Sequence, residues 1–290
     1  APMPYWGVAL SLGPNINAAM DPKVEPRAVE AMQKATARLS QATARERAYV
    51  EALAARYSAK KSVTRKAKDD GYAKAMRQVA REAPDDADAA TIAAEAMMVL
   101  RPWDYWRADG RPQPGTEEIL AILEAALRQH PDHPGACHYY IHAVEASLDP
   151  QRALDCAKRL PSLMPGAGHL VHMPAHIYMR LGRYREASER NATAAMVDHE
   201  YLSRHPLEGN YASGYYAHNL HFLNASLMME GRSAEALQVA RDLLAKVPGD
   251  EIAKEPSLEW YAPTVLLTMV RFGQWGDLIR HPPPSKSLRL

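Results

Sequence analysis

Two pairs of histidines repeat along the chain with a period of 34 residues. His138 and His142 are followed by His172 and His176, each 34 positions further on. Residues four positions apart share one face of a helix, with Cβ atoms about 5–6 Å apart. A period of 34 is typical of repeats made of two stacked helices, in which equivalent positions become neighbours in space. The spacing therefore predicts four imidazoles on one patch, which is the pattern of a transition-metal site.

Further donors fall on the same face when the repeats are aligned. His221 is equivalent to His172, and Glu95 is equivalent to His142. His169 and His218 lie one turn earlier, where they fit a role as ligands or as residues that orient ligands. The full set of predicted metal ligands is His138, His142, His172, His176, His221, Glu95, His169 and His218.

This donor set predicts two metal ions, because eight donors exceed the four or five positions of one ion. Copper is favoured because imidazole dominates the set, and zinc and iron are the alternatives. Glu95 favours iron or zinc for one of the two sites. Pro174 lies between His172 and His176, so a kink that displaces His176 is expected.

Two other side chains are candidates for catalysis. Glu145 follows His142 by three residues on the same helix face and could be a ligand, a general base or a solvated partner of the histidine. Tyr215 lies near His218, where it could line a substrate pocket together with Tyr211 and Tyr216.

Helical periodicity runs almost throughout the chain, and no segment alternates with a period of two. Tight turns centred on Gly182, Gly231 and Gly273 separate predicted helices, and prolines end others. Two polar segments rich in turn residues interrupt the rhythm, at residues 101–115 and 198–214. They are predicted either to cover the site as loops or to be plain excursions.

The motif GRYREA at Gly182–Ala187 resembles the tetratricopeptide consensus. The segments YWGVALSLGPNIN, RPWDYW, HPGACHYYIHAVEAS, GHLVHMPAHIYMRLGRY and HNLHFL resemble a bacterial family of tetratricopeptide proteins with repeated HxxxH pairs. The resemblance implies an all-α, right-handed solenoid of helix pairs with two inserted loops, and it implies that the histidines line the concave groove. It implies one domain over residues 1–290, weakly repetitive over 1–83, clearly repetitive over 84–250 and ending in a partial repeat over 251–290. It brings no activity with it.

Composition narrows the choice of partners and compartment. The formal net charge is +1, which argues against nucleic acid as a partner. The basic run over residues 60–68 is too short to change this and is predicted to be a solvated linker. No apolar run approaches the length needed to cross a bilayer, so no membrane association is expected. A cytoplasmic location is expected, with Ala1 as the end of a processed or trimmed chain.

Several functions fit these patterns. The favoured hypothesis is a metal-dependent enzyme, an oxidoreductase acting on a small organic or aromatic substrate. A metal-dependent hydrolase would use the same ligands to activate water. The remaining alternatives are a non-catalytic scaffold that binds a peptide or protein partner in the groove, and metal storage or sensing.

Overall fold

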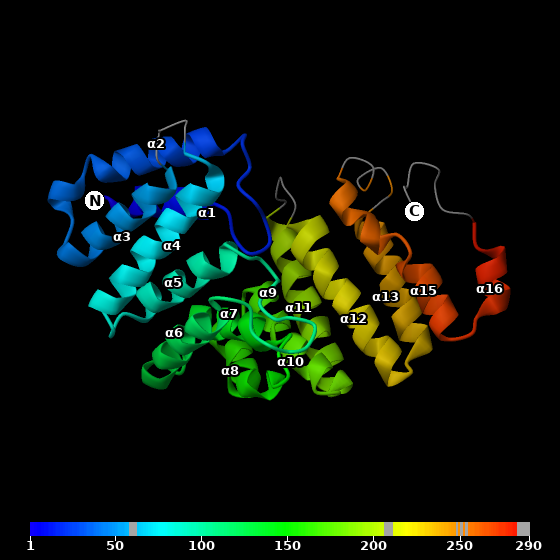
Figure 1. The fold of residues 1–290 in the computed structure, drawn as a ribbon. Helices are drawn as coiled ribbons and strands as arrows, with labels where there is room; N and C mark the ends of the chain where they lie inside the picture. Colours follow the sequence, from blue (N-terminus) through cyan, green and yellow to red (C-terminus); the bar gives the residue numbers. More distant parts are fainter. Residues whose placement is uncertain (58–62, 206–210, 248, 250–251, 253–254, 283–290) are drawn as a thin grey trace. The chain divides into compact units, whose positions relative to one another are not determined.

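The computed structural model describes residues 1–57, 63–205, 211–247, 249, 252 and 255–282. Within these ranges the chain is all-helical, with isolated bridges at Asn15–Ala18 and Trp106–Pro112 and no strand. Successive helices pack against one another along the chain (Figure 1), which confirms the predicted all-α class. The chain divides into two compact units, Ala1–Asp149 and Pro150–Leu290. The single domain over residues 1–290 stays a prediction.

The first unit consists of seven α-helices and two short 3₁₀ turns in the described part of residues 1–149. They are α1 (Met3–Ser11), α2 (Glu25–Thr36), η1 (Leu39–Gln41), α3 (Ala44–Ala54), η2 (Ala55–Tyr57), α4 (Arg65–Glu82), α5 (Ala87–Val99), α6 (Thr116–Gln129) and α7 (Pro134–Val144). α3 begins at a capping box in which Thr43 and Glu46 exchange hydrogen bonds.

The predicted linker over residues 60–68 is wrong in its second half. Residues 60–62 lie outside the described residues, but α4 already begins at Arg65 because the side chain of Thr64 accepts a hydrogen bond from the amide of Ala67. Lys68 then pairs with Glu25 of α2. Among the described basic side chains of this run, Arg65 also pairs with Glu25 of α2, whereas Lys66 pairs with Asp70 of α4 itself.

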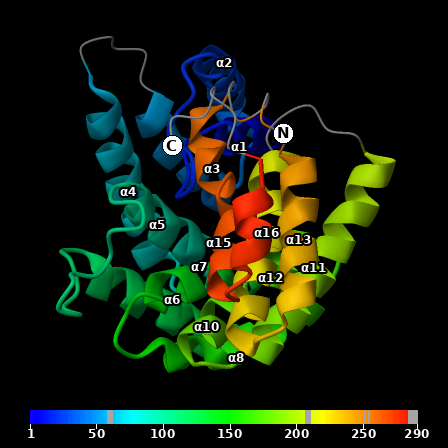
Figure 2. The same cartoon turned by 90° about the vertical axis from the view of Figure 1, so that its right-hand side faces the viewer.

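The second unit contains the 21-residue helix α11 (Tyr184–Arg204) together with several much shorter helices. Its elements are η3 (Pro150–Ala153), α8 (Leu154–Leu163), α9 (Gly168–His172), α10 (Pro174–Arg180), α11 (Tyr184–Arg204), the π-helical turn η4 (Ala212–Tyr216), α12 (Ala217–Glu230), α13 (Ser233–Lys246), η5 (Pro256–Tyr261), α15 (Thr264–Arg271) and α16 (Trp275–Arg280). α11, α12 and α13 lie side by side in both views (Figure 1, Figure 2). The loop predicted at 198–214 is wrong over most of its described residues, because α11 continues to Arg204 and η4 begins at Ala212. Residues 206–210 lie outside the described residues.

Three glycines end helices of the second unit in the same way. Gly182, Gly231 and Gly273 adopt positive φ angles of 71°, 77° and 64°, which cost a glycine little because it has no Cβ. The amide after each glycine donates to the carbonyl five residues earlier, in the pairs Arg183–Tyr178, Arg232–Leu227 and Gln274–Met269. The tight turns predicted at these glycines are confirmed.

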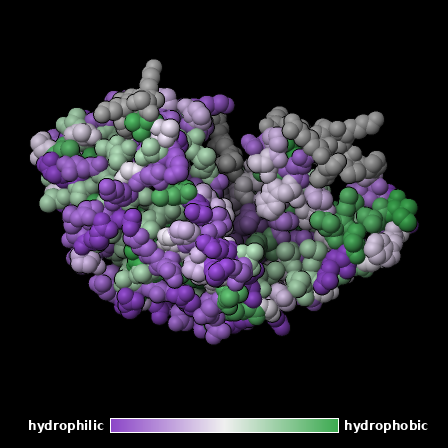
Figure 3. Space-filling model, viewed as in Figure 1, coloured by the Kyte–Doolittle hydropathy of each residue, from purple (hydrophilic) through white to green (hydrophobic). Residues whose placement is uncertain are grey.

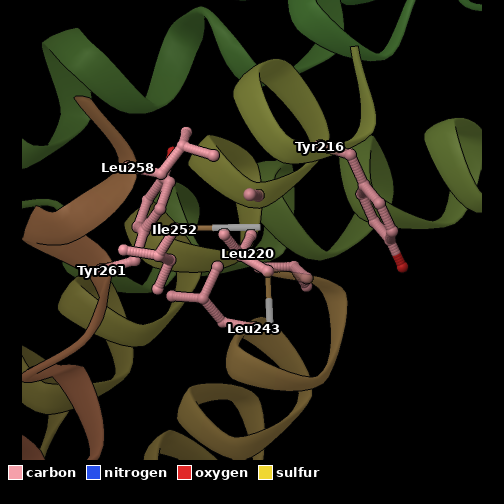
Figure 4. Close-up of a cluster of buried hydrophobic side chains, with 8 residues drawn as sticks. Tyr216, Leu220, Leu243, Ile252, Leu258 and Tyr261 are labelled. Atoms are coloured by element: carbon pink, nitrogen blue, oxygen red, sulfur yellow. The ribbon is translucent and has the colours of Figure 1, made fainter. Parts of the chain in front are cut away.

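The core of the second unit continues from α12 towards the C-terminus. Leu220 of α12, Leu243 of α13 and Leu258 and Tyr261 of η5 meet in one buried cluster (Figure 4). Further along, hydrophobic side chains gather over the surface at α16 (Figure 3), where Ile279 is 84% exposed. No helix in the described ranges is both long and apolar enough to cross a membrane.

Candidate metal centre

Three predicted ligands come together in the second unit. His172 ends α9, His176 lies in α10 and His218 lies in the first turn of α12. One ring nitrogen from each lies within 4.8 Å of the others. His172 is fully buried and His176 nearly so, whereas His218 is partly exposed. Two of the three rings are therefore shielded from solvent, and the third leaves one side of the group open to it.

The orientation of the His172 ring is set by a buried amide. Asn191 of α11 donates from Nδ2 to the carbonyl oxygen of Ala187 at 2.9 Å. Because that carbonyl can only accept, the amide oxygen must be the atom 2.6 Å from Nδ1 of His172. Nδ1 of His172 is therefore the protonated nitrogen, and Nε2 carries the lone pair. Metal-binding histidines are held in this way, with the second ring nitrogen donating to a neighbouring acceptor.

The same amide is tied to the next helix. Nδ2 of Asn191 also lies 3.4 Å from Oγ of Ser226 in α12, and that hydroxyl donates to the carbonyl of Phe222 at 2.8 Å. Asn191 and Ser226 are both fully buried. A chain of hydrogen bonds thus links α11 and α12 behind the three histidines, and it fixes the ring that lies deepest.

The two buried rings are spaced as ligands of one ion would be. Nε2 of His172 lies 2.9 Å from Nε2 of His176. Two nitrogens bound to one ion at about 2.0–2.1 Å lie about 2.9 Å apart at a right angle and about 3.4 Å apart at the tetrahedral angle. In the metal-free protein the same distance allows His176 to donate a proton to the His172 lone pair. An ion can take the place of that proton.

The expected kink at Pro174 is present. Proline has no backbone N–H, and the helix divides at Met173 into α9 and α10. The helical course nevertheless continues, since φ and ψ of Met173 are −48° and −38° and the amide of His176 donates to its carbonyl. The kink therefore does not move His176 away from His172.

Burial controls the protonation of the deepest ring. The pKa of His172 lies well below 6.5, first because the ring is buried, and then because His176, His218 and His169 are close enough to repel a second positive charge. The hydrogen bond to Asn191 opposes this shift. His172 is thus neutral at physiological pH, which is the form that binds metal.

His169 and Tyr215 flank the three histidines. The His169 ring lies 5.9 Å from that of His172 and 5.0 Å from that of Tyr215, centroid to centroid. Tyr215 belongs to η4, which follows the predicted insert. The insert therefore places an aromatic side chain beside the site.

A buried carboxylate fixes this flank. Asp198 of α11 is fully buried and accepts hydrogen bonds from Tyr211 at 2.8 Å and Asn219 at 2.6 Å. A Cβ added at Gly168 would overlap the carboxylate of Asp198, so α9 approaches α11 only because this residue is glycine. Burial raises the pKa of Asp198, and its two hydrogen bonds oppose that shift. One carboxylate thus joins the start of α9, the turn η4 and α12.

His221 is placed elsewhere. Its ring contacts those of Trp260 at 4.9 Å and Tyr261 at 5.4 Å, and burial lowers its pKa. The structure does not bring His221 into the group of three, although it shares the repeat position of His172. His218, one turn earlier on α12, lies beside His172 instead, with the two ring centroids 4.8 Å apart.

The first unit holds the other histidine pair. The rings of His138 and His142 lie 4.9 Å apart on α7. Nδ1 of His142 lies 3.1 Å from Oε1 of Glu145, so this carboxylate orients the His142 ring as Asn191 orients His172. The edge of Trp103 packs against His142 at 4.9 Å. Glu145 is therefore placed to position a ligand.

Glu95 lies in α5 and has its own surroundings. It is 8% exposed, and burial raises its pKa from 4.5 to about 7, opposed by the positive charge of Arg56. Within the described residues it does not join a group of donors spaced to hold an ion.

Sequence reasoning did not find the residues that hold the ligands. Asn191, Ser226 and Asp198 follow no repeat spacing, and each acts through a contact between helices that are distant in sequence. A polar residue on the buried face of an amphipathic helix was the signal available for Asn191 in α11.

Comparison with known proteins does not assign a function to this site. No protein-family model matches the chain, and no curated protein sequence matches it. The function must therefore be argued from the site.

Proposed function

We propose that this protein is a metal-dependent enzyme whose centre is built on His172, His176 and His218. The observation that carries the proposal is the state of His172: its Nδ1 is committed to Asn191, and its lone pair faces a second imidazole nitrogen at 2.9 Å. The two buried rings, His172 and His176, are thereby held at a spacing that two ligands of one ion would adopt.

Copper is the metal we favour, with zinc and iron as the alternatives. The three donors are imidazoles, and the 2.9 Å spacing suits the right-angled positions of a tetragonal copper site better than a tetrahedral zinc site. Three protein ligands leave a further coordination position for substrate or dioxygen. The partly exposed His218 marks the side from which either would enter.

The reaction we propose is oxidation or reduction of a small organic substrate, with an aromatic one favoured. Aromatic side chains surround the open side: Phe222 lies 5.4 Å and Trp260 lies 6.5 Å from the His218 ring, and Tyr215 lies beside His169. Such walls exclude water and accept a flat ring. A metal-dependent hydrolase using the same ligands is the alternative.

We propose a second ion at His138 and His142. Its support is the carboxylate of Glu145 on Nδ1 of His142, which orients this ring in the way that metal-binding histidines are held. Two ions remain the expectation from the number of donors.

We also propose that the helix pairs are tetratricopeptide-like and form a right-handed solenoid. The support is the repeated glycine turn at Gly182, Gly231 and Gly273 and the serial packing of successive helices. On this fold a scaffold for a peptide partner is the competing function, and it would need no metal.

A paired set of variants tests the proposal. One carries His172→Ala and His176→Ala, and its control carries His199→Ala and His205→Ala, which replace two exposed histidines of the same unit. Protein purified without added metal is measured for bound metal and for oxygen consumption with phenols and catechols. We expect metal and turnover in the wild type and the control but not in the first variant. Wild-type protein that is folded, metal-free and unable to bind added Cu²⁺ or Zn²⁺ would overturn the proposal.

A further inference from the structure

A separate cavity of about 340 Å³ lies in the first unit. It opens between the loop at residues 14–20, the first turns of α4, the end of α5 and the insert at 101–115. Its apolar wall includes Ile16, Val99, Pro102 and Trp103, and its polar side chains include Arg65 and Asp69. The volume falls within the range of about 300–1,000 Å³ that is usual for small-molecule sites.

The charges at the polar side of the cavity favour an anion. Asp69 lies 3.2 Å from Nε of Arg56 and 3.6 Å from Nε of Arg65, so one carboxylate serves two guanidinium groups. Glu25 in turn pairs with both Arg65 and Lys68. Three cations thus share two carboxylates, which leaves one positive charge in excess.

Arg56, one of these three cations, is not among the residues that line the cavity, and its guanidinium lies 4.0 Å from the centre of the Tyr72 ring. Its side chain is fully buried, and Nη1 and Nη2 have no hydrogen-bond partner among the described residues. Leaving guanidinium N–H groups unpaired in the interior is costly. A Cβ added at Gly13 would lie 3.4 Å from Nη1, so this nitrogen lies against the backbone next to Pro14, which lines the cavity.

Trp103 forms part of the apolar wall of the cavity. Its backbone has a φ of 64°, a left-handed conformation that is strained for a bulky side chain. Strain of this kind persists where the surroundings impose it, and it is concentrated at functional sites. The indole is nevertheless 49% exposed. The chain thus holds a large, half-exposed aromatic surface at the cavity in a left-handed backbone conformation, with the ring also in contact with His142.

We propose that this cavity binds a small aromatic monocarboxylate, with its ring against Trp103 and its carboxylate towards Arg65. The ring covers exposed indole surface, and the carboxylate offsets the excess positive charge and accepts hydrogen bonds from guanidinium groups. No histidine lines the cavity. The cavity does not include His172, His176 or His218, although Trp103 also contacts His142 of the proposed second ion. Binding to it can be tested with metal-free protein.

The test uses fluorine NMR of three probes that share one ring: 4-fluorobenzoate, the neutral 4-fluorobenzyl alcohol and the cationic 4-fluorobenzylamine. Each is titrated into metal-free full-length protein at pH 6. We expect the acid to bind roughly tenfold more tightly than the alcohol, since only the acid gains charge-assisted hydrogen bonds, and the amine to bind least.

Two matched variants locate the binding. Ala19→Trp places a large side chain in this cavity at an exposed position, and Ala37→Trp does the same in a second cavity of about 380 Å³, which has no charged residue among those that line it. Ala19→Trp is expected to weaken binding of the acid at least roughly tenfold, and Ala37→Trp to leave it unchanged. Circular dichroism confirms that both fold.

Four results would overturn the proposal: no detectable binding of the acid, equal binding of acid and alcohol, tighter binding of the amine, or binding that survives Ala19→Trp. Because no metal is present in these titrations, such a failure leaves the metal centre untouched.

Discussion

Replacing Asn191 by Ala tests whether metal binding depends on the orientation of the His172 ring, because it leaves His172 itself in place. The change removes the acceptor for Nδ1 of His172 without touching any of the three histidines. His172 is fully buried, so its N–H then has no partner, which costs about 1–3 kcal/mol of folding stability. Loss of an orienting partner typically weakens metal binding about 10–100-fold, which corresponds to about 1.4–2.7 kcal/mol.

Asn224→Ala is the matched control. Asn224 is equally buried and also bridges elements of the second unit, donating to the carbonyl of Ala236 at 2.9 Å and to Thr268 at 3.0 Å, but it contacts no histidine. Both variants are expected to lose similar stability in urea denaturation, whereas only Asn191→Ala should weaken metal binding. Asn191→Asp keeps an acceptor and should retain the affinity.

Affinity is measured for Cu²⁺ and Zn²⁺ by competition with a chromogenic chelator. Equal losses of affinity in the two alanine variants would mean that the effect comes from general destabilisation. An unchanged affinity in Asn191→Ala would refute the assignment of His172 as an oriented ligand.

Three further predictions address other parts of the structure. His218→Ala should weaken metal binding at least about tenfold, whereas His221→Ala should change it by less than about twofold, because His221 packs against aromatic rings away from the three ligands. A larger loss of affinity from His221→Ala in the same chelator assay would contradict this placement. Gly168→Ala should lower the free energy of unfolding by about 1–3 kcal/mol, since its Cβ overlaps a buried carboxylate. Gly166→Ala, whose Cβ meets open space, should change it by less than about 0.5 kcal/mol. Equal urea midpoints for the two variants would count against the close approach of Gly168 to Asp198. Burial raises the pKa of Glu95 from 4.5 to about 7, so between these pH values the native state keeps the proton that the unfolded chain loses, and stability falls as pH rises. Glu95→Gln should therefore gain up to ~3 kcal/mol of unfolding free energy over the wild type at pH 8 but little at pH 4.5. A gain that is the same at both pH values would show that this carboxyl titrates normally.

The sequence was sufficient for features with a local cause. The all-helical class was predicted from periodicity, and the described residues form helices without a strand. The kink at Pro174 follows from a missing amide hydrogen, and the turns at Gly182 and Gly231 from the tolerance of glycine for positive φ. Each of these depends on residues within one or two helical turns.

Features that depend on contacts between helices were not predictable in the same way. The repeat frame placed His221 and His172 at equivalent positions, but His218, one turn earlier on α12, is the histidine whose ring lies beside that of His172. The spacing of residues along one helix likewise shows which of them share a face, but it does not show which residues of another helix contact that face. The hydrogen bond between Asn191 and His172 could therefore be seen only in the structure. The left-handed backbone of Trp103 has no signal in the residue type, which disfavours it.

The central claim is that imidazoles of the second unit share a metal ion, and one crystallographic measurement addresses it most directly. Protein purified without added metal is analysed for its elements, and an anomalous-scattering map is collected at the absorption edge of the metal found. The account predicts a peak about 2.0–2.1 Å from Nε2 of both His172 and His176, with His218 as the third ligand. A fully folded protein with no bound metal, and no anomalous peak at these rings after soaking with Cu²⁺ or Zn²⁺, would contradict it.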